Sequence, residues 1–381
     1  MSVVQHSEGN MKPLPSDALI QMKCVIFAEG TFGLFSSKIA ASFLRYCADR
    51  CVAVIDSTKA GLSVQHVLGY GGAIPIVSSV AEALPLAPRV LLVGKALQFV
   101  DGRTGGKDDL PAVWRSQFLE AMRAGLHIIN TIHYRFDDDR ELASCAEESG
   151  VTVWETKSAP PVALNKARTL DLDTLIIHTC GSDCNIGKKT TSLEIYAEAN
   201  RRGIKTGFAA TGQTGTIISG RGITIDSVPG DFMSGAVERL VLDAAAGKDW
   251  VVVEGQASIN HIAHAGVALA ILHGAMPHVL VFCHRLGLER IKVFETKIPP
   301  ISRLIRLNEE LASIERPAKV AAISLNSAGA SDAEFERAAR GLREETGLPV
   351  IDPCRQGAGA LVDVLVEHER RHVPRRRSAR A

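Results

Sequence analysis

The stretch GSDCNIGKKTT, residues 181–191, has the residue types of a loop that binds phosphate. It lies between the apolar run TLIIHTC and a helical pattern, which is the strand, loop and helix order that phosphate loops require. In such loops backbone N–H groups converge on the anion, glycines allow close approach, and a lysine adds charge. We expect Lys188 to act as an exposed cation. The expected phosphate contacts are Gly181, Ser182, Cys184, Asn185, Ile186, Gly187, Lys188, Lys189, Thr190 and Thr191.

The loop departs from the standard phosphate-loop pattern in two places. Five residues rather than four separate Gly181 from Gly187, and Lys189 stands where a magnesium-binding Ser or Thr is expected. The hydroxyl residues Thr190 and Thr191 follow only after Lys189, later than the pattern requires. If either hydroxyl reaches magnesium, ATP chemistry is available. If neither does, the loop can hold a pyrophosphate such as that of coenzyme A without metal, balanced by lysines and the helix dipole.

Three residues are candidates for catalysis. Glu254 ends the very apolar run WVVVEG, so burial would raise its pKa toward that of a useful base; a magnesium ligand and a loop-capping acceptor are the alternatives. Asp183 lies inside the loop, where a carboxylate beside phosphates is repelled unless it points at a metal, a lysine or an amine. His261 follows the Glu254 strand and is a candidate second proton carrier.

A polar segment over residues 211–231 is expected to hold the substrate. Gln213 and Thr214 of TGQTG offer groups suited to a carboxylate or an oxyanion, with a plain glycine turn as the alternative. Arg221 would pair with a substrate carboxylate or remain a solvated surface residue. Asp226 and Asp231 flank SVPG, and Asp231 has a helix cap as its alternative role.

No metal site is predicted from the histidine and cysteine patterns. The histidines at 261, 264, 273, 278 and 284 are spaced by three, nine, five and six residues, which does not match a metalloprotease helix. His278 and His284 bracket an apolar strand and are interpreted as structural. The eight cysteines lack the paired spacing of a zinc ribbon and are expected to be reduced and buried.

Two series of β-branched runs alternate with helical patterns and would position these residues. The expected strands lie at 24–30, 52–56, 74–78, 90–94, 127–132 and 151–155, and then at 174–180, 204–211, 250–255, 278–284, 320–326 and 348–352. This pattern predicts an α/β protein with two doubly wound domains, a Rossmann-like N-terminal domain and a P-loop NTPase-like C-terminal domain.

The prolines of KSAPPVALNKART mark the predicted domain boundary. We expect a flexible N-terminus over 1–21, the Rossmann-like domain over 22–157, a linker over 158–170, the P-loop domain over 171–368 and a basic flexible tail over 369–381. In the first domain, Gly30 and Gly33 match only part of a dinucleotide fingerprint. Asp56 ends the second strand, as a ribose-binding carboxylate or as an ordinary strand-end residue.

The composition excludes several classes of protein. A chain of 381 residues, 46% hydrophobic and 22% charged, can build two folded domains and is too apolar to be disordered. With 43 Lys and Arg against 42 Asp and Glu, no global field recruits nucleic acid or an anionic membrane. A signal-peptide core and an apolar run of membrane-spanning length are both lacking. We therefore expect a cytoplasmic homo-oligomer with a small-molecule substrate.

The motifs GSDCNIGKKTT, TGQTG, GDFMSGAVE, VVVEGQASI, ALAILHGAMPHVLVFCHRLG and PVIDPCRQG occur in this order. Together they resemble the D-glutamate N-acetyltransferase-like family, over most of residues 22–366. The resemblance implies a Rossmann-like domain followed by a P-loop domain. It also implies transfer of an acetyl group from acetyl-CoA to the amine of D-glutamate or a related amino acid.

A more distant likeness is to dethiobiotin synthetase, whose phosphate loop has the same GxDxxxGK spacing and whose VEG strand end matches residues 253–255. In that enzyme a hydroxyl residue directly follows the lysine and helps to hold magnesium, whereas Lys189 occupies the place here. Two alternatives to the transferase therefore stay open, an ATP- and Mg-dependent ligase or kinase and a non-catalytic nucleotide sensor.

Overall fold

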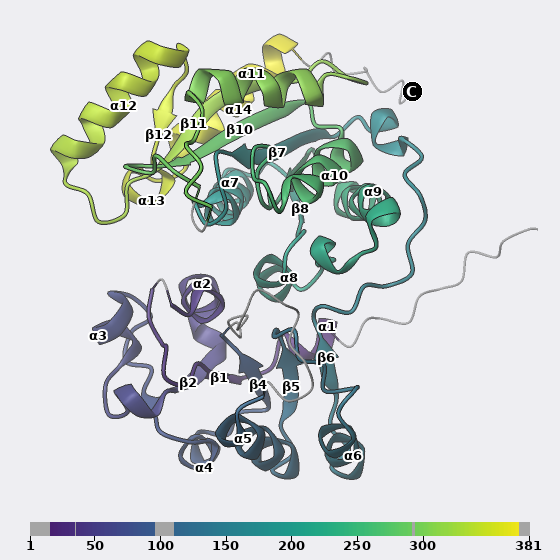
Figure 1. Cartoon of the computed structure of the whole chain (residues 1–381), viewed down its shortest axis with the longest axis vertical. Coiled ribbons are helices and arrows are strands. Elements are labelled where there is room, and N and C mark those ends of the chain that lie inside the picture. Colours follow the sequence, from purple (N-terminus) through teal and green to yellow (C-terminus); the bar gives the residue numbers. More distant parts are fainter. Residues whose placement is uncertain (1–15, 35, 96–109, 292–293, 373–381) are drawn as a thin grey trace, which may run out of the picture. The chain divides into compact units, whose positions relative to one another are not determined.

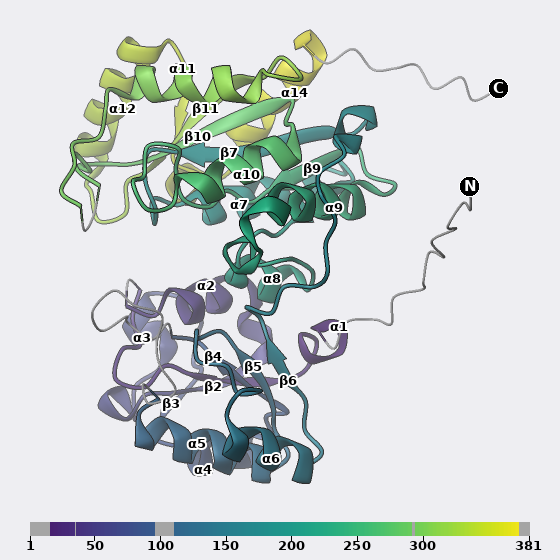
Figure 2. The same cartoon turned by 45° about the vertical axis from the view of Figure 1, so that its right-hand side comes forward.

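A computed structural model of the chain describes residues 16–34, 36–95, 110–291 and 294–372. The chain divides into two compact units, Met1–Lys157 and Ser158–Ala381 (Figures 1 and 2). Each unit is built on one six-stranded sheet whose strands all run parallel. The predicted α/β fold with two doubly wound domains is confirmed.

The N-terminal unit has the strand order β3-β2-β1-β4-β5-β6, which is that of a Rossmann fold. Helices α2 and α3 lie on one side of the sheet and α4 to α6 on the other (Figure 1). Its strands are β1 (Cys24–Phe27), β2 (Cys51–Ile55), β3 (Ile76–Val77), β4 (Val90–Val93), β5 (His127–Asn130) and β6 (Val153–Glu155). Its helices are α1 (Ser16–Leu19), α2 (Lys38–Cys47), α3 (Val64–Leu68), α4 (Val80–Ala83), α5 (Ala112–Arg123) and α6 (Arg140–Glu148).

Asp56, the candidate ribose ligand, is fully buried and binds its own domain. Its carboxylate accepts hydrogen bonds from the backbone N–H groups of Gly30 at 3.1 Å and Phe32 at 2.7 Å. Thr58 donates to it from both its backbone and its hydroxyl. These bonds hold the turn after β1 against the turn after β2, so the described contacts of Asp56 are those of a structural strand-end residue.

The C-terminal unit has the strand order β12-β11-β10-β7-β9-β8. Helices α9 to α12 pack along one face, and α7 and α14 cover the other (Figure 1). Its strands are β7 (Leu175–Gly181), β8 (Thr206–Ala209), β9 (Trp250–Val253), β10 (Val279–Arg285), β11 (Lys319–Asn326) and β12 (Val350–Ile351). Its helices are α7 (Lys188–Arg201), α8 (Gln213–Ser219), α9 (Met233–Ala245), α10 (Ala265–Ala275), α11 (Ile301–Ala312), α12 (Asp332–Thr346), α13 (Pro353–Gln356) and α14 (Gly359–His372).

Both ends of the described chain are more ordered than expected. Leu19 and Ile20 are buried, although they fall within the stretch expected to be flexible. Helix α14 continues to His372, and Trp250 Nε1 donates to Glu369 Oε2 at 3.1 Å. The basic segment expected to form a flexible tail therefore starts with helical residues, and its part beyond 372 lies outside the described residues.

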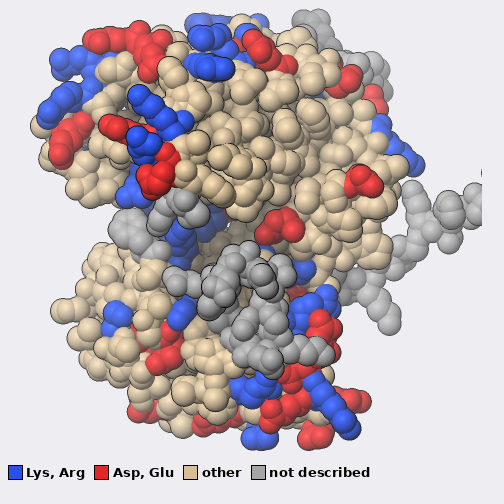
Figure 3. All heavy atoms as spheres, in the orientation of Figure 1, with Lys and Arg blue, Asp and Glu red and all other residues tan. Residues whose placement is uncertain are grey.

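Charged side chains of both signs occur on the surface, as the balanced composition predicts, and six of the eight cysteines are buried as predicted. On the face drawn in Figure 3, basic and acidic side chains are intermixed over both units. Cys184 is half-exposed and Cys354 is exposed, whereas the other six cysteines are buried and all eight are free thiols. In the part of the chain that the structure describes, helices long and apolar enough to cross a membrane are not found.

Glu238 of α9 fixes the proline-rich segment to the C-terminal unit. Its buried carboxylate accepts from the backbone N–H groups of Lys166 at 3.1 Å and Arg168 at 2.7 Å. The Arg168 guanidinium also donates to it, at 2.8 Å. Burial raises the pKa of Glu238, but the hydrogen bonds from Arg168 and Lys166 outweigh it, so that the pKa lies below its ordinary value. The linker is thus held by a buried negative charge.

Replacing Glu238 by Gln should lower the free energy of unfolding by about 1–3 kcal/mol near neutral pH, since charge-assisted hydrogen bonds are lost. Because the folded pKa of Glu238 is depressed, the stabilisation exists above the ordinary carboxyl pKa and is lost as the pH falls through the folded value.

Denaturant unfolding at neutral and acidic pH measures both effects. The gap between wild type and E238Q should shrink in acid, and a gap of equal size at both pH values would contradict the role of the charge. E336Q, at an exposed ion pair of α12, is the control and should change little.

Candidate functional site

The glycine-rich sequence forms a loop between β7 and α7, at the carboxyl edge of the C-terminal sheet. Gly181 is needed because an added Cβ would lie 2.5 Å from the Cys283 carbonyl oxygen on the neighbouring strand. Asn185 and Gly187 have positive φ angles of 57° and 111°. Helix α7 then begins without a side-chain cap. Its first N–H groups are thus left to other partners, as in helices that bind anions.

Lys188 is folded back beneath the loop. Its Nζ donates to the Asp183 carbonyl oxygen at 2.5 Å, and the residue is only 5% exposed. Burial lowers the pKa of this ammonium group. The expectation of an exposed cation is therefore wrong for this structure. An anion bound by the loop would have to replace the carbonyl as the partner of the ammonium group.

Some of the residues expected to contact phosphate point into the domain. Ser182 and Thr191 are buried, with hydroxyl contacts of 2.8 Å to His284 Nδ1 and to Ser324 Oγ. Their backbone N–H groups donate to other carbonyls of the domain. Ile186 is buried as well. These residues shape the loop, while Cys184, Lys189 and Thr190 retain partial exposure.

Glu254 lies directly after β9 and is 1% exposed. Its Oε2 accepts from the backbone N–H groups of Thr211 at 3.1 Å and Gly212 at 3.2 Å. Burial raises the pKa of Glu254 to about 7, opposed by the nearby Lys189 and by these N–H donors. The raised pKa suits a proton acceptor near neutral pH, and the N–H contacts match the loop-capping alternative.

Asp183, Cys184 and His261 come together beside the loop. The Asp183 carboxylate lies 3.8 Å from His261 Nε2 and accepts from the Cys184 N–H at 2.6 Å. The His261 ring is buried, stacks on His264 at 4.6 Å, and accepts from the Ala263 N–H at Nδ1. Burial, followed by the adjacent His264, lowers the pKa of His261, so the neutral imidazole is favoured.

The segment expected to hold the substrate divides into two parts. Gln213 and Thr214 begin α8, directly after the Gly212 N–H that binds Glu254. Arg221 and Asp226 are exposed in the turns that follow α8. Asp231 is exposed too, and the N-cap residue of α9 is Phe232 with no side-chain cap, so the capping alternative for Asp231 is wrong.

Other polar residues of the site were not singled out from the sequence. Asn260 Nδ2 donates to the Ser182 carbonyl oxygen at 3.0 Å, and Asn326 lies 3.5 Å from where a Cβ on Gly187 would be. Asn326 ends β11, and this strand-end position was an available signal, whereas Asn260 lies in the loop before His261 and carries no such signal. His278 and His284 are largely buried, which lowers their pKa values to about 3 and about 4, consistent with structural histidines.

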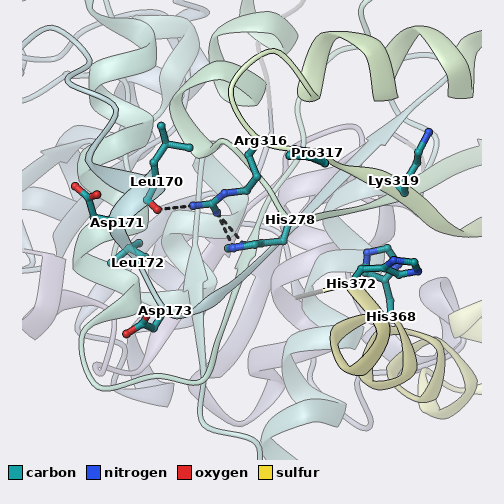
Figure 4. A pocket seen from close by; sticks show the side chains of 10 residues that line it. All are labelled: Leu170, Asp171, Leu172, Asp173, His278, Arg316, Pro317, Lys319, His368 and His372. Atoms are coloured by element: carbon teal, nitrogen blue, oxygen red, sulfur yellow. Dashed lines mark hydrogen bonds between the residues drawn. The ribbon is translucent and has the colours of Figure 1, made fainter. Parts of the chain in front are cut away.

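A separate cavity of about 370 Å³ lies where β7, β10 and β11 begin, at the edge opposite the loop (Figure 4). Arg316 donates to the carbonyl oxygens of Met276, Thr169 and Leu170 and to the His278 ring. This arginine therefore ties the start of β10 to the segment before β7. The cavity is lined by Leu170, Asp171, Leu172, Asp173, His278, Arg316, Pro317, Lys319, His368 and His372.

Comparison with known proteins gives matches over most of the chain. The P-loop domain of unknown function DUF1611_C matches residues 162–362, and the Rossmann-like domain DUF1611_N matches residues 57–159. A protein of Pseudoalteromonas sp named D-glutamate N-acetyltransferase is 31% identical, over 89% of this chain and 97% of its own. A protein of the same name from Tritonibacter scottomollicae is 32% identical, over 91% and 99%. A DUF1611 family protein from Anabaena variabilis has a solved structure with a TM-score of 0.84, 32% identity and 91% and 99% coverage.

Replacing Lys188 by Ala should weaken the binding of inorganic pyrophosphate about 10- to 100-fold, because one charge-assisted hydrogen bond to the anion is lost. Titration calorimetry measures the affinity, and circular dichroism checks that the fold is kept. K248A removes an exposed lysine that lies outside the loop and should bind like wild type. Equal affinity of K188A and wild type would remove Lys188 from the anion site.

Proposed function

The chain belongs to the DUF1611 family, and from this premise we propose that it is an N-acetyltransferase that moves the acetyl group of acetyl-CoA to the amine of D-glutamate or a related amino acid. The observation that carries the proposal is a phosphate loop in which Lys189 follows Lys188. Such a loop suits a pyrophosphate held by N–H groups and cations without magnesium. The two relatives named for this activity match the chain over nearly their whole length.

In the proposed complex, the CoA pyrophosphate binds the loop and the first turn of α7. Cys184, Asn185 and Gly187 supply backbone around the anion, and the half-exposed Lys189 adds charge at its rim. Lys188 would exchange the Asp183 carbonyl oxygen, its present partner at 2.5 Å, for a phosphate oxygen. The exchange would give an anionic hydrogen-bond partner to a buried ammonium group that now donates to a neutral carbonyl oxygen.

Acetyl transfer needs an acid-base group as well as a place for the donor. The substrate ammonium must lose a proton before its nitrogen attacks the thioester carbonyl, and the CoA thiolate leaves as the amide forms. The pKa of Glu254, about 7, matches this proton transfer near neutral pH. Asp183 and His261 are the other candidates for moving the proton, and all three are buried.

The length of CoA puts a condition on these roles. A pantetheine arm separates the pyrophosphate from the thioester, whereas Glu254 contacts the turn at Thr211 and Gly212 and interacts with Lys189 at the start of α7. Glu254 can therefore act as the base only if the arm folds back over the loop. Otherwise it holds the turn at residues 211–212, and the proton acceptor lies farther along the arm.

An ATP- and Mg-dependent ligase or kinase is the second candidate. It is favoured by the GxDxxxGK spacing and by Glu254, a carboxylate at the end of the strand beside the phosphate loop. In this candidate Thr190, half-exposed in the first turn of α7, would serve magnesium together with Glu254. The non-catalytic sensor would bind the same ligands without turning them over.

Titration calorimetry with acetyl-CoA and with ATP, each with and without magnesium, separates these candidates. The transferase should bind acetyl-CoA equally well with and without the metal, and should then acetylate amino acids in a screen of both stereoisomers. ATP binding that requires magnesium, with no response to acetyl-CoA, would assign the loop to an ATP-dependent enzyme. Tight binding of acetyl-CoA with no acetylated product would favour the sensor.

Replacing Glu254 by Gln should lower kcat about 100-fold or more and change the acetyl-CoA affinity little, if Glu254 is the base. For the wild type, the rate should rise with pH through the folded pKa of about 7, since the carboxylate is the reactive form. E254Q should lose this rise. Steady-state kinetics from mildly acidic to mildly alkaline pH measures both effects.

E155Q is the matched control for this substitution. Glu155 is also buried, with its pKa raised by burial to about 7, but it belongs to β6 of the other unit. It should keep the wild-type pH profile. Parallel losses of kcat and acetyl-CoA affinity in E254Q would instead make Glu254 a binding residue.

A further inference from the structure

We propose that Asp183, Cys184 and His261 form a site for a divalent transition metal ion of the zinc type. One ligand atom of each residue lies within 4.8 Å of the other two. Asp183 and His261 are buried, while Cys184 is half-exposed and leaves the cluster accessible. The proposal goes beyond the transferase function, because it concerns metal binding in the absence of any acetyl donor.

The three ligand types determine which metal fits. A carboxylate oxygen, a thiolate sulfur and an imidazole nitrogen are the ligands of zinc, whereas Mg²⁺ prefers oxygen ligands throughout. Zinc bonds of about 2.0–2.3 Å place tetrahedral ligand atoms roughly 3.3–3.7 Å from one another. His261 Nε2 and Asp183 Oδ1 are 3.8 Å apart, so this pair of ligands needs little movement, and the Cys184 sulfur lies within 4.8 Å of both.

A second observation comes from the neighbouring Asn260. Its Nδ2 is fixed by the Ser182 carbonyl oxygen, while its Oδ1 is buried and accepts no hydrogen bond among the described residues. Asn260 directly precedes His261, and Ser182 directly precedes Asp183. The carboxamide hydrogen bond therefore joins the chain neighbours of two proposed ligands. A buried acceptor without a donor favours a cation or a metal-bound water nearby.

The charge balance of the loop favours a cation at the same place. A carboxylate inside an anion-binding loop repels the anion unless positive charge compensates it. The Lys188 ammonium donates to the main-chain carbonyl of Asp183, 2.5 Å away. A metal ion on the Asp183 carboxylate would add positive charge to the loop without using Lys188, and would reduce the repulsion between this carboxylate and an anion bound by the lysine.

Metal binding changes the protonation of two ligands. The Cys184 thiol releases its proton to solvent and binds as the thiolate. His261 would bind through Nε2 with its proton on Nδ1, which requires giving up the 3.2 Å hydrogen bond from the Ala263 N–H. Closing the site therefore breaks one hydrogen bond, which comes from a loop amide next to the exposed Ile262.

Cobalt titration of the chelator-treated protein tests the proposal, because a cobalt–thiolate bond gives a charge-transfer band that is independent of activity. Wild type should bind one Co²⁺ per chain with this band, and Zn²⁺ should displace it. C184S should lose the band, and both C184S and H261Q should bind Zn²⁺ at least tenfold more weakly. Thermal melting checks that both variants remain folded.

C354S and H273Q are the matched controls, since they remove an exposed cysteine and an exposed histidine outside the cluster. Both should keep the band and the wild-type affinity. A wild type without the band, or a band that survives in folded C184S, would overturn the proposal. Failure of the metal titration leaves the proposed transferase in place, whereas a bound metal would remove Asp183 and His261 as candidate proton carriers and leave Glu254; acetyl transfer is assayed separately with acetyl-CoA and an amino acid.

Discussion

The close approach of β7 and β9 fixes the geometry on which the C-terminal site depends. An added Cβ on Gly255 would lie 1.7 Å from the Thr179 carbonyl oxygen, so no other residue fits there without moving a strand. The Gly255 N–H donates to Thr179 Oγ1, which in turn contacts Ser192 Oγ of α7 at 2.8 Å. One glycine thus links the end of β9 to the strand before the phosphate loop and to the helix after it. Glu254 directly precedes this glycine, and Cδ of Lys188 lies 3.1 Å from where a Cβ on Gly255 would be, so the contact brings both residues close together.

Burial raises the pKa of Glu254 at the edge of this sheet, but a pKa raised by burial does not by itself identify a catalytic group. Glu155 in the N-terminal unit has its pKa raised to about 7 by the same effect, and its carboxylate accepts from Asn130 and from the Phe136 N–H. Glu254 likewise holds a turn through backbone N–H groups. What distinguishes Glu254 is its place beside the glycine-rich loop proposed to bind the anion, and the nearby Lys189. The surroundings of a perturbed group therefore carry the functional argument, and the perturbed pKa only permits it.

The sequence was sufficient to predict the two sheets, because strands buried on both faces read as continuous apolar runs such as WVVV and VLLV. It also predicted the loop, since GSDCNIGKK combines glycines and lysine at a strand-to-helix junction. It did not predict the direction of individual side chains. Lys188 was expected outside and lies inside, because its long side chain can turn back onto the Asp183 carbonyl oxygen. The sequence spacing predicts the backbone position of a residue, whereas packing determines where the polar end of its side chain lies.

The meeting of Asp183 and His261 shows a second limit of sequence patterns. The two residues lie in the loops that follow the neighbouring strands β7 and β9, and are separated by helices and strands in the chain. The spacing among histidines along the chain therefore gives no sign that His261 lies next to Asp183. In a parallel sheet, strands adjacent in space can be distant in sequence, so their carboxyl ends create clusters that no local spacing contains. The same topology applies to the proposed site: the strand-to-helix turn after β7 would hold the anion, whereas the candidate acid-base groups Glu254 and His261 follow the neighbouring strand β9, so the loop motif alone does not specify the chemistry.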